Sequence, residues 1–287
     1  MLDTSASCHS ERGEGSGPIA AEPDPAAASQ PQDDKSWIVR ALLAGVLLMA
    51  TACGTKEAPG PLEPSGPTGR VRFVNVITDP ARNPVNAILE SLPFGVNLTY
   101  TTSTPATLPA PSTANYAAIL AGNRSLVVKR TADTSVTLAT INFSIAAGQD
   151  RTVYAIGGTG GATVTSFLTT DDNGAPASGQ VKLRIVNLSP TAGAVDVFVT
   201  APNADLATAT PTVANLAYQS ASTYVAIPAG TYQVRFVPAG TAAGSRAVSV
   251  TINVASLAVA AGAGRTIVAA DNSSGGTPLR AFVLTDQ

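Results

Sequence analysis

The chain has 287 residues, long enough for one large domain or two of ordinary size, and a formal net charge of −2. Only 13% of its residues are charged and 5% are aromatic, whereas charged residues usually make up about a quarter of a soluble protein; this composition favours an extracytoplasmic β-rich protein over a charged cytosolic enzyme. One histidine and two cysteines leave little room for imidazole, thiolate or zinc chemistry.

Residues 1–34 are rich in proline, glycine, serine and acidic side chains, with almost no large apolar ones. Such a segment cannot bury enough surface to offset its chain entropy, so we expect it to be disordered. An extension of this kind ahead of a secretion signal is atypical, and a start assigned too far upstream is the simplest account of it. We therefore leave it out of the fold prediction.

Residues 35–52 have the pattern of a secretory signal peptide. Lys35 and Arg40 form a positive start, Ala41–Ala50 is an uncharged apolar run, and small residues follow. The run is too short to span a bilayer, which takes roughly 20 apolar residues. It predicts export rather than a transmembrane helix.

The residues around Cys53 resemble the lipobox of bacterial lipoproteins, here Ala50-Thr51-Ala52-Cys53-Gly54. The resemblance implies that the Cys53 thiol carries a diacylglycerol, that the signal is cut before it, and that the new N-terminus takes a further acyl chain such as palmitate; several chains anchor a protein stably. Ala50 departs from the leucine that the family prefers. Gly54 is not the aspartate of inner-membrane retention, so the implied place is the outer membrane of a bacterial cell envelope, facing the periplasm or the surface. The alternative is an ordinary signal peptide with an incidental cysteine.

Residues 53–69 form the predicted lipidated cysteine and a Pro/Gly-rich tether, which should hold the folded part away from the membrane. Three of the 17 basic and seven of the 19 acidic residues precede Cys53, so the processed chain is slightly basic. Its basic residues are scattered, and the sequence predicts no nucleic-acid partner.

Beyond the tether the sequence repeats itself with a period of about 110 residues, which indicates a repeated domain. The copies open with R-V-R-F-V-N-V and K-L-R-I-V-N-L, share a Tyr followed by Ala-Gly, share an Ala-Gly followed by Arg-Thr, and close with F-L-T-T-D and F-V-L-T-D. These landmarks lie, in the two copies, at 70–76 and 182–188, 116–122 and 224–230, 147–152 and 261–266, and 166–171 and 281–286.

Short runs rich in Val, Ile and Thr, separated by Gly, Pro, Asn and Asp, predict strands in both copies, for example at 124–129, 231–237 and 248–254. No stretch after Cys53 has a convincing helical period. The predicted fold is all-β: two tandem antiparallel β-sandwich domains with immunoglobulin-like Greek-key connections, at 70–172 and 179–287. No cysteine follows Cys53, so each core must form without a disulfide.

This set of motifs resembles the family of the domain of unknown function 4397, in two copies that cover most of 69–287. The resemblance implies secreted or lipid-anchored bacterial proteins with β-sandwich domains, often in tandem. The family carries no established catalytic residues, so the resemblance transfers no site. The first copy departs from the pattern at Thr101–Thr113, a Thr/Pro-rich insertion with weak strand character.

The remaining side chains offer few routes to catalysis. The single histidine, His9, precedes the signal, so a Ser-His-Asp or Cys-His arrangement lacks its base, and we predict no zinc or cofactor site. Asp171 and Asp172 are adjacent acids between the copies, which we interpret as a solvated linker; a carboxylate pair for hydrolysis and a calcium site with Asn173 are weaker alternatives. The glycine cluster at 157–161 predicts a hairpin turn rather than a phosphate cradle, because a strand follows it.

Two pairs of arginines recur at equivalent places in the copies, Arg72 with Arg184 and Arg151 with Arg265. We interpret them as strand arginines that face solvent or pair across the sheet. The alternative is a set of carboxylate- or glycan-binding points.

Two other recurring pairs have predicted structural roles. For Tyr116 and Tyr224 we expect a hydrogen bond like that of a tyrosine corner, which closes the sandwich. Asn75 and Asn187 stand near strand ends before a proline and are expected to satisfy local backbone groups rather than a ligand.

The sequence thus predicts a non-catalytic, lipid-anchored cell-envelope protein that presents two sandwiches for structural or adhesive contacts with an envelope polymer, a glycan or a protein. The alternative is an extracytoplasmic ligand- or glycan-binding module, for instance at the junction 171–180, and a carboxylate-dependent hydrolase is a weaker one. Cys53, at the membrane, is the one site residue predicted. No catalytic, metal or cofactor residue is predicted, and the ligand-binding residues stay unassigned.

Overall fold

The computed structural model describes residues 66–105 and 116–287. These belong to one compact unit, which runs from Pro59 to Gln287. The predictions made for 1–34, for the signal peptide at 35–52, for Cys53 and for most of the tether lie outside the described residues. Within the described ranges, no helix is both long and apolar enough to cross a membrane.

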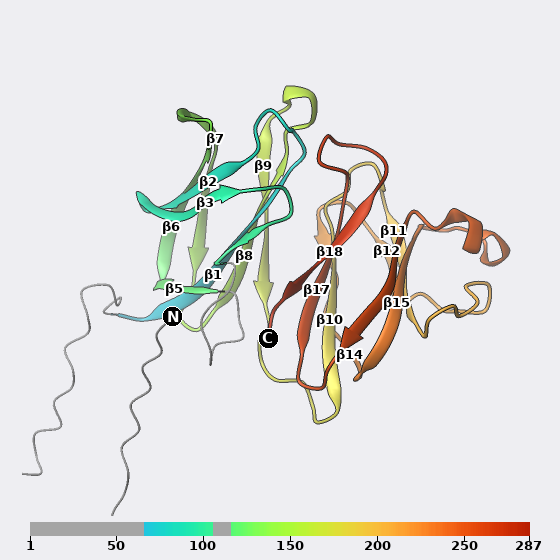
Figure 1. Ribbon diagram of the computed structural model, residues 1–287. Helices are drawn as coiled ribbons and strands as arrows, with labels where there is room; N and C mark the ends of the chain where they lie inside the picture. Colours follow the sequence, from blue (N-terminus) through green and yellow to red (C-terminus); the bar gives the residue numbers. More distant parts are fainter. Residues whose placement is uncertain (1–65, 106–115) are drawn as a thin grey trace, which may run out of the picture. The chain divides into compact units, whose positions relative to one another are not determined.

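Within residues 66–105 and 116–171, the first repeat has nine strands in two sheets (Figure 1). One sheet has the order β4-β1-β8-β9, with β5 also paired to β1, and the other has the order β3-β2-β6-β7. The strands are β1 (Thr68–Ile77), β2 (Val85–Leu89), β3 (Leu92–Leu98), β4 (Ser103–Thr104), β5 (Ala117–Leu120), β6 (Gly122–Arg130), β7 (Asp133–Ile145), β8 (Asp150–Gly157) and β9 (Val164–Asp171).

The second repeat has the same nine strands in the same order. Its sheets run β13-β10-β17-β18, with β14 also paired to β10, and β12-β11-β15-β16. The strands are β10 (Gln180–Asn187), β11 (Val195–Thr200), β12 (Val213–Leu216), β13 (Ser220–Ala221), β14 (Val225–Pro228), β15 (Gly230–Pro238), β16 (Ile252–Val259), β17 (Gly264–Ala270) and β18 (Arg280–Thr285). The prediction of an all-β chain with two tandem sandwiches is confirmed.

One strand pair in each repeat differs from the predicted antiparallel arrangement. β1 pairs with β8 in parallel, and β10 pairs with β17 in parallel, while the other pairs are antiparallel. A parallel pair needs a long connection. Here the whole second sheet lies between β1 and β8 in the chain, so the connection is long enough.

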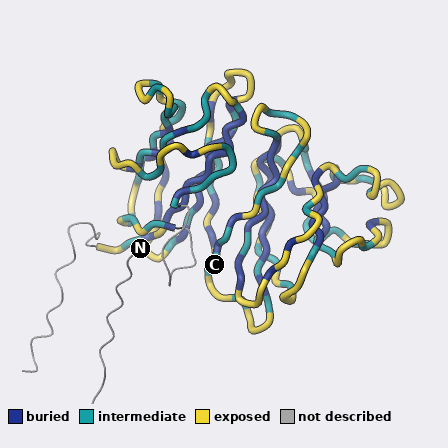
Figure 2. Tube along the Cα trace, in the orientation of Figure 1, coloured by how far each residue is buried: buried dark blue, intermediate teal, exposed yellow. Residues whose placement is uncertain are grey.

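The central strands are buried on both faces (Figure 2). Along β1, Val71 and Phe73 point into the core between the two sheets of the first repeat. Val74 and Val76 point the other way, yet they are also buried, in a separate cluster that includes Val186 of β10. Alternate residues of a strand face opposite sides, so the five-stranded sheets of the two repeats pack against each other through these outer faces.

That cluster forms a third apolar core, between the repeats. It holds aliphatic and aromatic side chains from β1, β8, β10, β17 and β18, with Tyr100 and the phenylalanines of β9 and β18 packed at its margin. Its buried members are Val74, Val76, Tyr154, Ile156, Val186, Leu188, Val268, Ala270 and Leu284.

The outer sheet of the second repeat is covered by its own connections. Leu206, from the segment after β11, packs on Phe198 and Val237 in a small buried cluster. The segment between β15 and β16 also covers this sheet, through Val250. It includes the first half of the strand predicted at 248–254. That prediction is wrong there, because Ala247–Ser249 is a turn of 3-10 helix and β16 begins at Ile252.

Candidate functional site

The recurring arginine of the first repeat, Arg72, is fully buried on the outer face of β1. Its Nε and Nη2 donate to the hydroxyl of Thr152 on β8, at 3.1 and 3.0 Å. Its Nη1 donates to the carbonyl oxygen of Thr285, at 2.8 Å, and its Nη2 forms an ion pair with Asp286, at 2.8 Å. Thr285 and Asp286 belong to the second repeat, so Arg72 reaches across to the neighbouring sheet.

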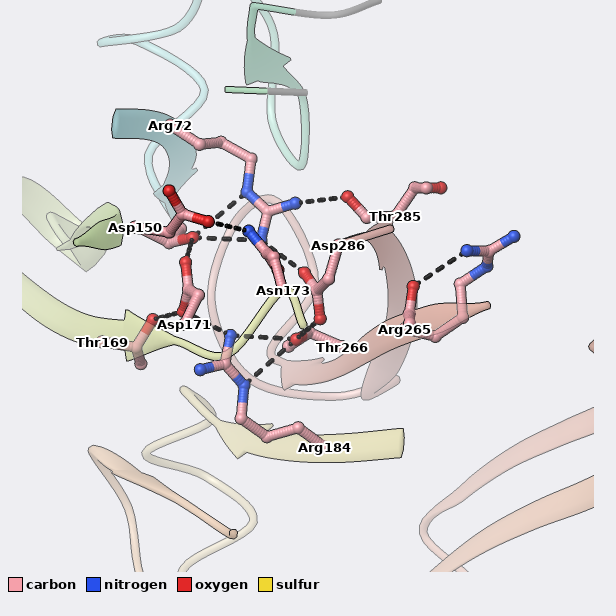
Figure 3. Close-up of polar contacts among 12 residues, drawn as sticks. Arg72, Asp150, Thr169, Asp171, Asn173, Arg184, Arg265, Thr266, Thr285 and Asp286 are labelled. Atoms are coloured by element: carbon pink, nitrogen blue, oxygen red, sulfur yellow. Dashed lines mark hydrogen bonds and ion pairs between the residues drawn. The ribbon is translucent and has the colours of Figure 1, made fainter. Parts of the chain in front are cut away.

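Arg184 makes the same set of contacts in the opposite direction. On β10, it donates through Nε and Nη2 to the hydroxyl of Thr266 on β17, at 3.1 and 2.9 Å. Its Nη1 donates to the carbonyl oxygen of Thr170 at 3.2 Å, and its Nη2 lies 2.7 Å from a carboxylate oxygen of Asp171. Figure 3 shows the two guanidinium groups entering one cluster of polar side chains from opposite sides.

Each carboxylate is held by side chains of its own repeat as well. Asp171, the last residue of β9, accepts hydrogen bonds from the hydroxyls of Tyr116, Thr152 and Thr169, at 2.8, 2.5 and 2.7 Å. The carboxylate of Asp286 accepts from its own tyrosine and threonine in the same way, Tyr224 at 3.1 Å and Thr266 at 2.5 Å. The arginine, threonine, tyrosine and aspartate of each copy therefore form one network.

The two ion pairs are shielded from water. The side chains are 0% exposed in the pair of Arg72 with Asp286, and 3% and 0% exposed in the pair of Arg184 with Asp171. Burial by itself lowers the pKa of each arginine, but the neighbouring carboxylates and tyrosines raise it above its usual range, so both stay cationic. The cost of burying these charges is met by complete pairing and hydrogen bonding.

The tyrosines also support the arginines through their rings. The guanidinium carbon of Arg72 lies 4.5 Å from the ring centre of Tyr116, and that of Arg184 lies 4.7 Å from Tyr224, within the range of cation–π attraction. Burial raises the pKa of both tyrosines. They remain neutral donors to the carboxylates over the whole range in which the protein would be handled.

The structure corrects the interpretation of these recurring residues. Arg72 and Arg184 do not face solvent, and their ionic partners lie in the other repeat rather than across their own sheet. Asp171 is not part of a solvated linker, since it is buried at the end of β9. The hydroxyl of Tyr116 binds this carboxylate, where the sequence predicted a tyrosine corner. Asp172 alone fits the linker interpretation, with a side chain 68% exposed and paired with Lys182.

The other recurring pairs bind backbone groups of their own repeat. Arg151 and Arg265 donate to backbone carbonyl oxygens, of Ser144 for the first and of the last residue for the second. Asn75 and Asn187 each donate to a backbone carbonyl and accept from a backbone amide two residues on. The prediction that these asparagines satisfy the backbone is confirmed.

The two predictions made for loops have different outcomes. The glycine cluster 157–161 forms the hairpin between β8 and β9, as predicted. The weak calcium interpretation of 171–173 is not favoured, because Asp171 is taken up by the network and the Asn173 amide donates to Asp150. Among the described residues, no group of three or more histidine, cysteine, aspartate or glutamate side chains is placed to hold a metal ion.

An open groove lies beside the network, with a volume of about 550 Å³. One wall is β9 and the residue after it, 167–172, and the other is the segment 221–224, with Arg184 between them. Its polar surface comes from threonines, Ser222, Asp172 and Tyr224, since Arg184 and Asp171 are already paired with each other.

Sequence reasoning missed the role of three residues. Thr152 and Thr266 recur after the matching Arg151 and Arg265, so their equivalence was visible, but nothing in the sequence tells that a threonine bridges an arginine and an aspartate. Tyr154, two residues after Thr152, is fully buried between the repeats and its hydroxyl has no partner among the described residues. Burial raises its pKa to about 12.

Of the comparisons with known proteins, only the family comparison gives a result that can be used. No curated protein matches the chain significantly. A crystal structure of a leucine-rich repeat protein from Bacteroides thetaiotaomicron VPI-5482 is 14% identical over 75% of this chain and 26% of that one, with a TM-score of 0.17. The chain thus spans about a quarter of that protein's length, and a likeness this low carries no conclusion.

The family model for a domain of unknown function, DUF4397, matches residues 69–198 and 199–287. The two segments together span both sandwiches, although the division between them falls in β11, well after the point where the first sandwich ends. The structural copies, with the same nine strands and the same polar network, account for a double match. The resemblance inferred from the sequence motifs is confirmed: the chain belongs to the DUF4397 family and carries two tandem copies of its domain.

Proposed function

We propose that this chain is a non-catalytic, lipid-anchored protein of the bacterial cell envelope, which presents its two sandwiches for structural or adhesive contacts. One observation carries the proposal. Among the polar residues that recur in both copies, the buried arginines and aspartates, which are the natural candidates for chemistry, hold the two repeats together. Arg72, Asp171, Arg184 and Asp286 are buried and bonded to groups of the chain itself.

The arrangement does not favour a carboxylate-dependent hydrolase. A catalytic acid needs a carboxyl group that reaches the substrate and can carry a proton. Asp171 and Asp286 instead each contact a guanidinium group and two or three hydroxyl donors of the chain itself, so their oxygens are already occupied. Their side chains are closed to solvent. We therefore assign the function to the outer surface of the sandwiches.

The proposed anchor is tested first at Cys53. In a bacterial host that processes lipoproteins, the wild-type chain should incorporate an alkyne-tagged fatty acid and partition into detergent. Cys53→Ala should do neither. Cys8→Ala is the matched control, because it removes the other cysteine of the chain and should be labelled like the wild type. A labelled Cys53→Ala protein refutes the anchor.

The proposed role is tested in the native envelope. A tag placed after Gln287 should be lost when protease is added to intact cells if the sandwiches face outward, and only after lysis if they face the periplasm. Deletion of the gene should reduce attachment or weaken the envelope, with restoration by the wild-type gene and not by the Cys53→Ala gene. A deletion strain that attaches and resists detergent like its parent contradicts the role.

The groove at 167–172 and 221–224 favours a second candidate, a binding module for a glycan or another small ligand. Its threonines and Tyr224 offer hydroxyl and aromatic contacts of the kind that sugars use. A panel of envelope and matrix sugars should then raise the melting temperature through mass action. The rise should disappear in Thr223→Arg, which blocks the groove from an exposed position.

A further inference from the structure

The contacts between the repeats obey a twofold relation. The arginine of repeat 1 meets the aspartate of repeat 2, and the arginine of repeat 2 meets the aspartate of repeat 1. The second contact of each guanidinium, with the carbonyl oxygen of the residue before the aspartate, is exchanged in the same way. An interface in which residue i meets j and j meets i is isologous, the type that identical subunits form in a symmetric dimer.

An isologous interface does not need the covalent connection between its halves. Its two buried ion pairs join β1 and β9 of one repeat to β10 and Asp286 of the other. The buried members of its apolar cluster lie on β1, β8, β10, β17 and β18 or, for Leu188, directly after β10. The connecting residues after Asp171 add contacts of their own, such as Lys182 with Asp172. They do not supply the paired arginines and aspartates, so these faces are complementary whether they belong to one chain or to two.

The apolar side chains make the pairing selective. Tyr154 is fully buried in the apolar cluster between the repeats. Its equivalent in the second repeat, two residues after Thr266, is the much smaller Val268, also buried there. Near a twofold axis each residue faces its own equivalent. Repeat 1 against repeat 1 would therefore bring two tyrosines together, and repeat 2 against repeat 2 would leave a void.

We propose that these two faces form a docking surface between copies of this chain, with repeat 1 of one copy seated on repeat 2 of the other. The bound partner is thus a second copy of the same protein, joined by exchange of repeats. This inference rests on the proposed function only for its setting, since anchored chains on one or two envelopes are held at the high local concentration that exchange needs. It names a homophilic partner for the adhesive contact.

Charge-swapped full-length chains test the docking directly. The first variant combines Arg72→Asp with Asp171→Arg. Within one chain, each new side chain then faces a partner of the same charge, Asp286 or Arg184. In the second, Arg184→Asp with Asp286→Arg does the same from the other side. Mixed together, the altered repeat 1 of one chain and the altered repeat 2 of the other regain both ion pairs, and the two unaltered repeats form the native set.

Light scattering should give the mass of one chain for each variant alone and the mass of two chains for the mixture. Circular dichroism checks that each variant is folded. Two folded variants that stay single in the mixture overturn the proposal. Dimers formed by the first variant alone overturn the selectivity assigned to Tyr154, because that variant's repeat 1 is matched to itself in charge.

A second pair of variants alters no buried residue, so it tests the proposal even if the charge-swapped chains fail to fold. Deletion of 174–178 shortens the connection between β9 and β10 and prevents a chain from pairing with itself. This protein should run as a stable two-chain species, while insertion of five glycine and serine residues at the same place, the matched control, should leave one chain. A folded, single-chain deletion variant overturns the proposal. Neither result bears on the lipid at Cys53, so failure here is separate from failure of the proposed anchor.

Discussion

Arg72 illustrates, at the scale of the residue, how a charge is kept in a dry interface. Arg72→Met leaves Asp286 buried and unpaired, which should lower the free energy of unfolding by about 3–5 kcal/mol. Arg72→Met combined with Asp286→Asn should lose less than the sum of the single changes, because no lone charge remains. Urea denaturation measures both.

Arg130→Met is the control for this prediction. Its pair with Asp133 is 34% and 44% exposed, and such a pair contributes about 0–1 kcal/mol. Equal losses for Arg72→Met and Arg130→Met would show that burial of the first pair is not what matters.

The buried tyrosines predict a dependence on alkaline pH. Burial raises the pKa of Tyr116 and Tyr224 in the folded protein, while an unfolded chain releases these protons near pH 10. Their contribution to the free energy of unfolding is therefore complete below about pH 10. It is lost as the pH rises further, by up to about 1.4 kcal/mol per tyrosine and pH unit. Denaturation midpoints from pH 8 to 11 should fall above pH 10, and the fall should be shallower in Tyr116→Phe. Tyrosinate absorbance that appears before unfolding would contradict this account.

Much of this site was present in the sequence as recurrence, but its meaning was not. That Arg72 matches Arg184 and that Asp171 matches Asp286 can be read from the two copies. A strand arginine is far more often exposed than buried, so the residues alone favour solvent. Arg72 lies on the same strand face as Val74 and Val76. Only the packing of these two valines against the second repeat shows that Arg72 is covered as well.

At the scale of the element, the covering segments of the second repeat give the clearest test. Leu206 is 1% exposed where its segment covers the outer sheet, and Arg246 holds its backbone by donating a hydrogen bond to its carbonyl oxygen at 3.2 Å. Leu206→Ala should cost about 2–5 kcal/mol through the lost contacts and the cavity, and the segment 201–212 should become sensitive to protease. Val248→Ala is the control, since Val248 is 88% exposed on the neighbouring segment. Equal proteolysis of the two variants would refute the covering role.

The strand prediction at 248–254 was wrong in its first half because this part also belongs to a covering segment. Its valines alternate with small polar residues as in a half-buried strand, and the same alternation is compatible with a segment that crosses the outside of a sheet. What decides between them is whether a neighbouring strand offers backbone partners. β15 offers them only from Thr251 onward.

At the scale of the whole molecule, the third apolar core makes two similar domains into one unit. Tandem domains often unfold separately when their interface is small and polar. Here the outer faces of two five-stranded sheets are buried against each other, and the charged residues between them are fully paired. The motifs that recur in each copy include the arginine and the aspartate that bind the other repeat.

The chain from residue 66 to 287 should consequently unfold in a single cooperative transition. Calorimetry of the wild type should give one peak, with a calorimetric enthalpy equal to the van't Hoff enthalpy. Arg72→Met combined with Arg184→Met leaves a carboxylate unpaired on each side and weakens chiefly the contact between repeats, so the peak should split into two at lower temperatures. Leu126→Ala, which opens a cavity inside the first sandwich where Leu126 is fully buried, should lower the single peak without splitting it. Two peaks in the wild type would mean that the third core does not couple the repeats.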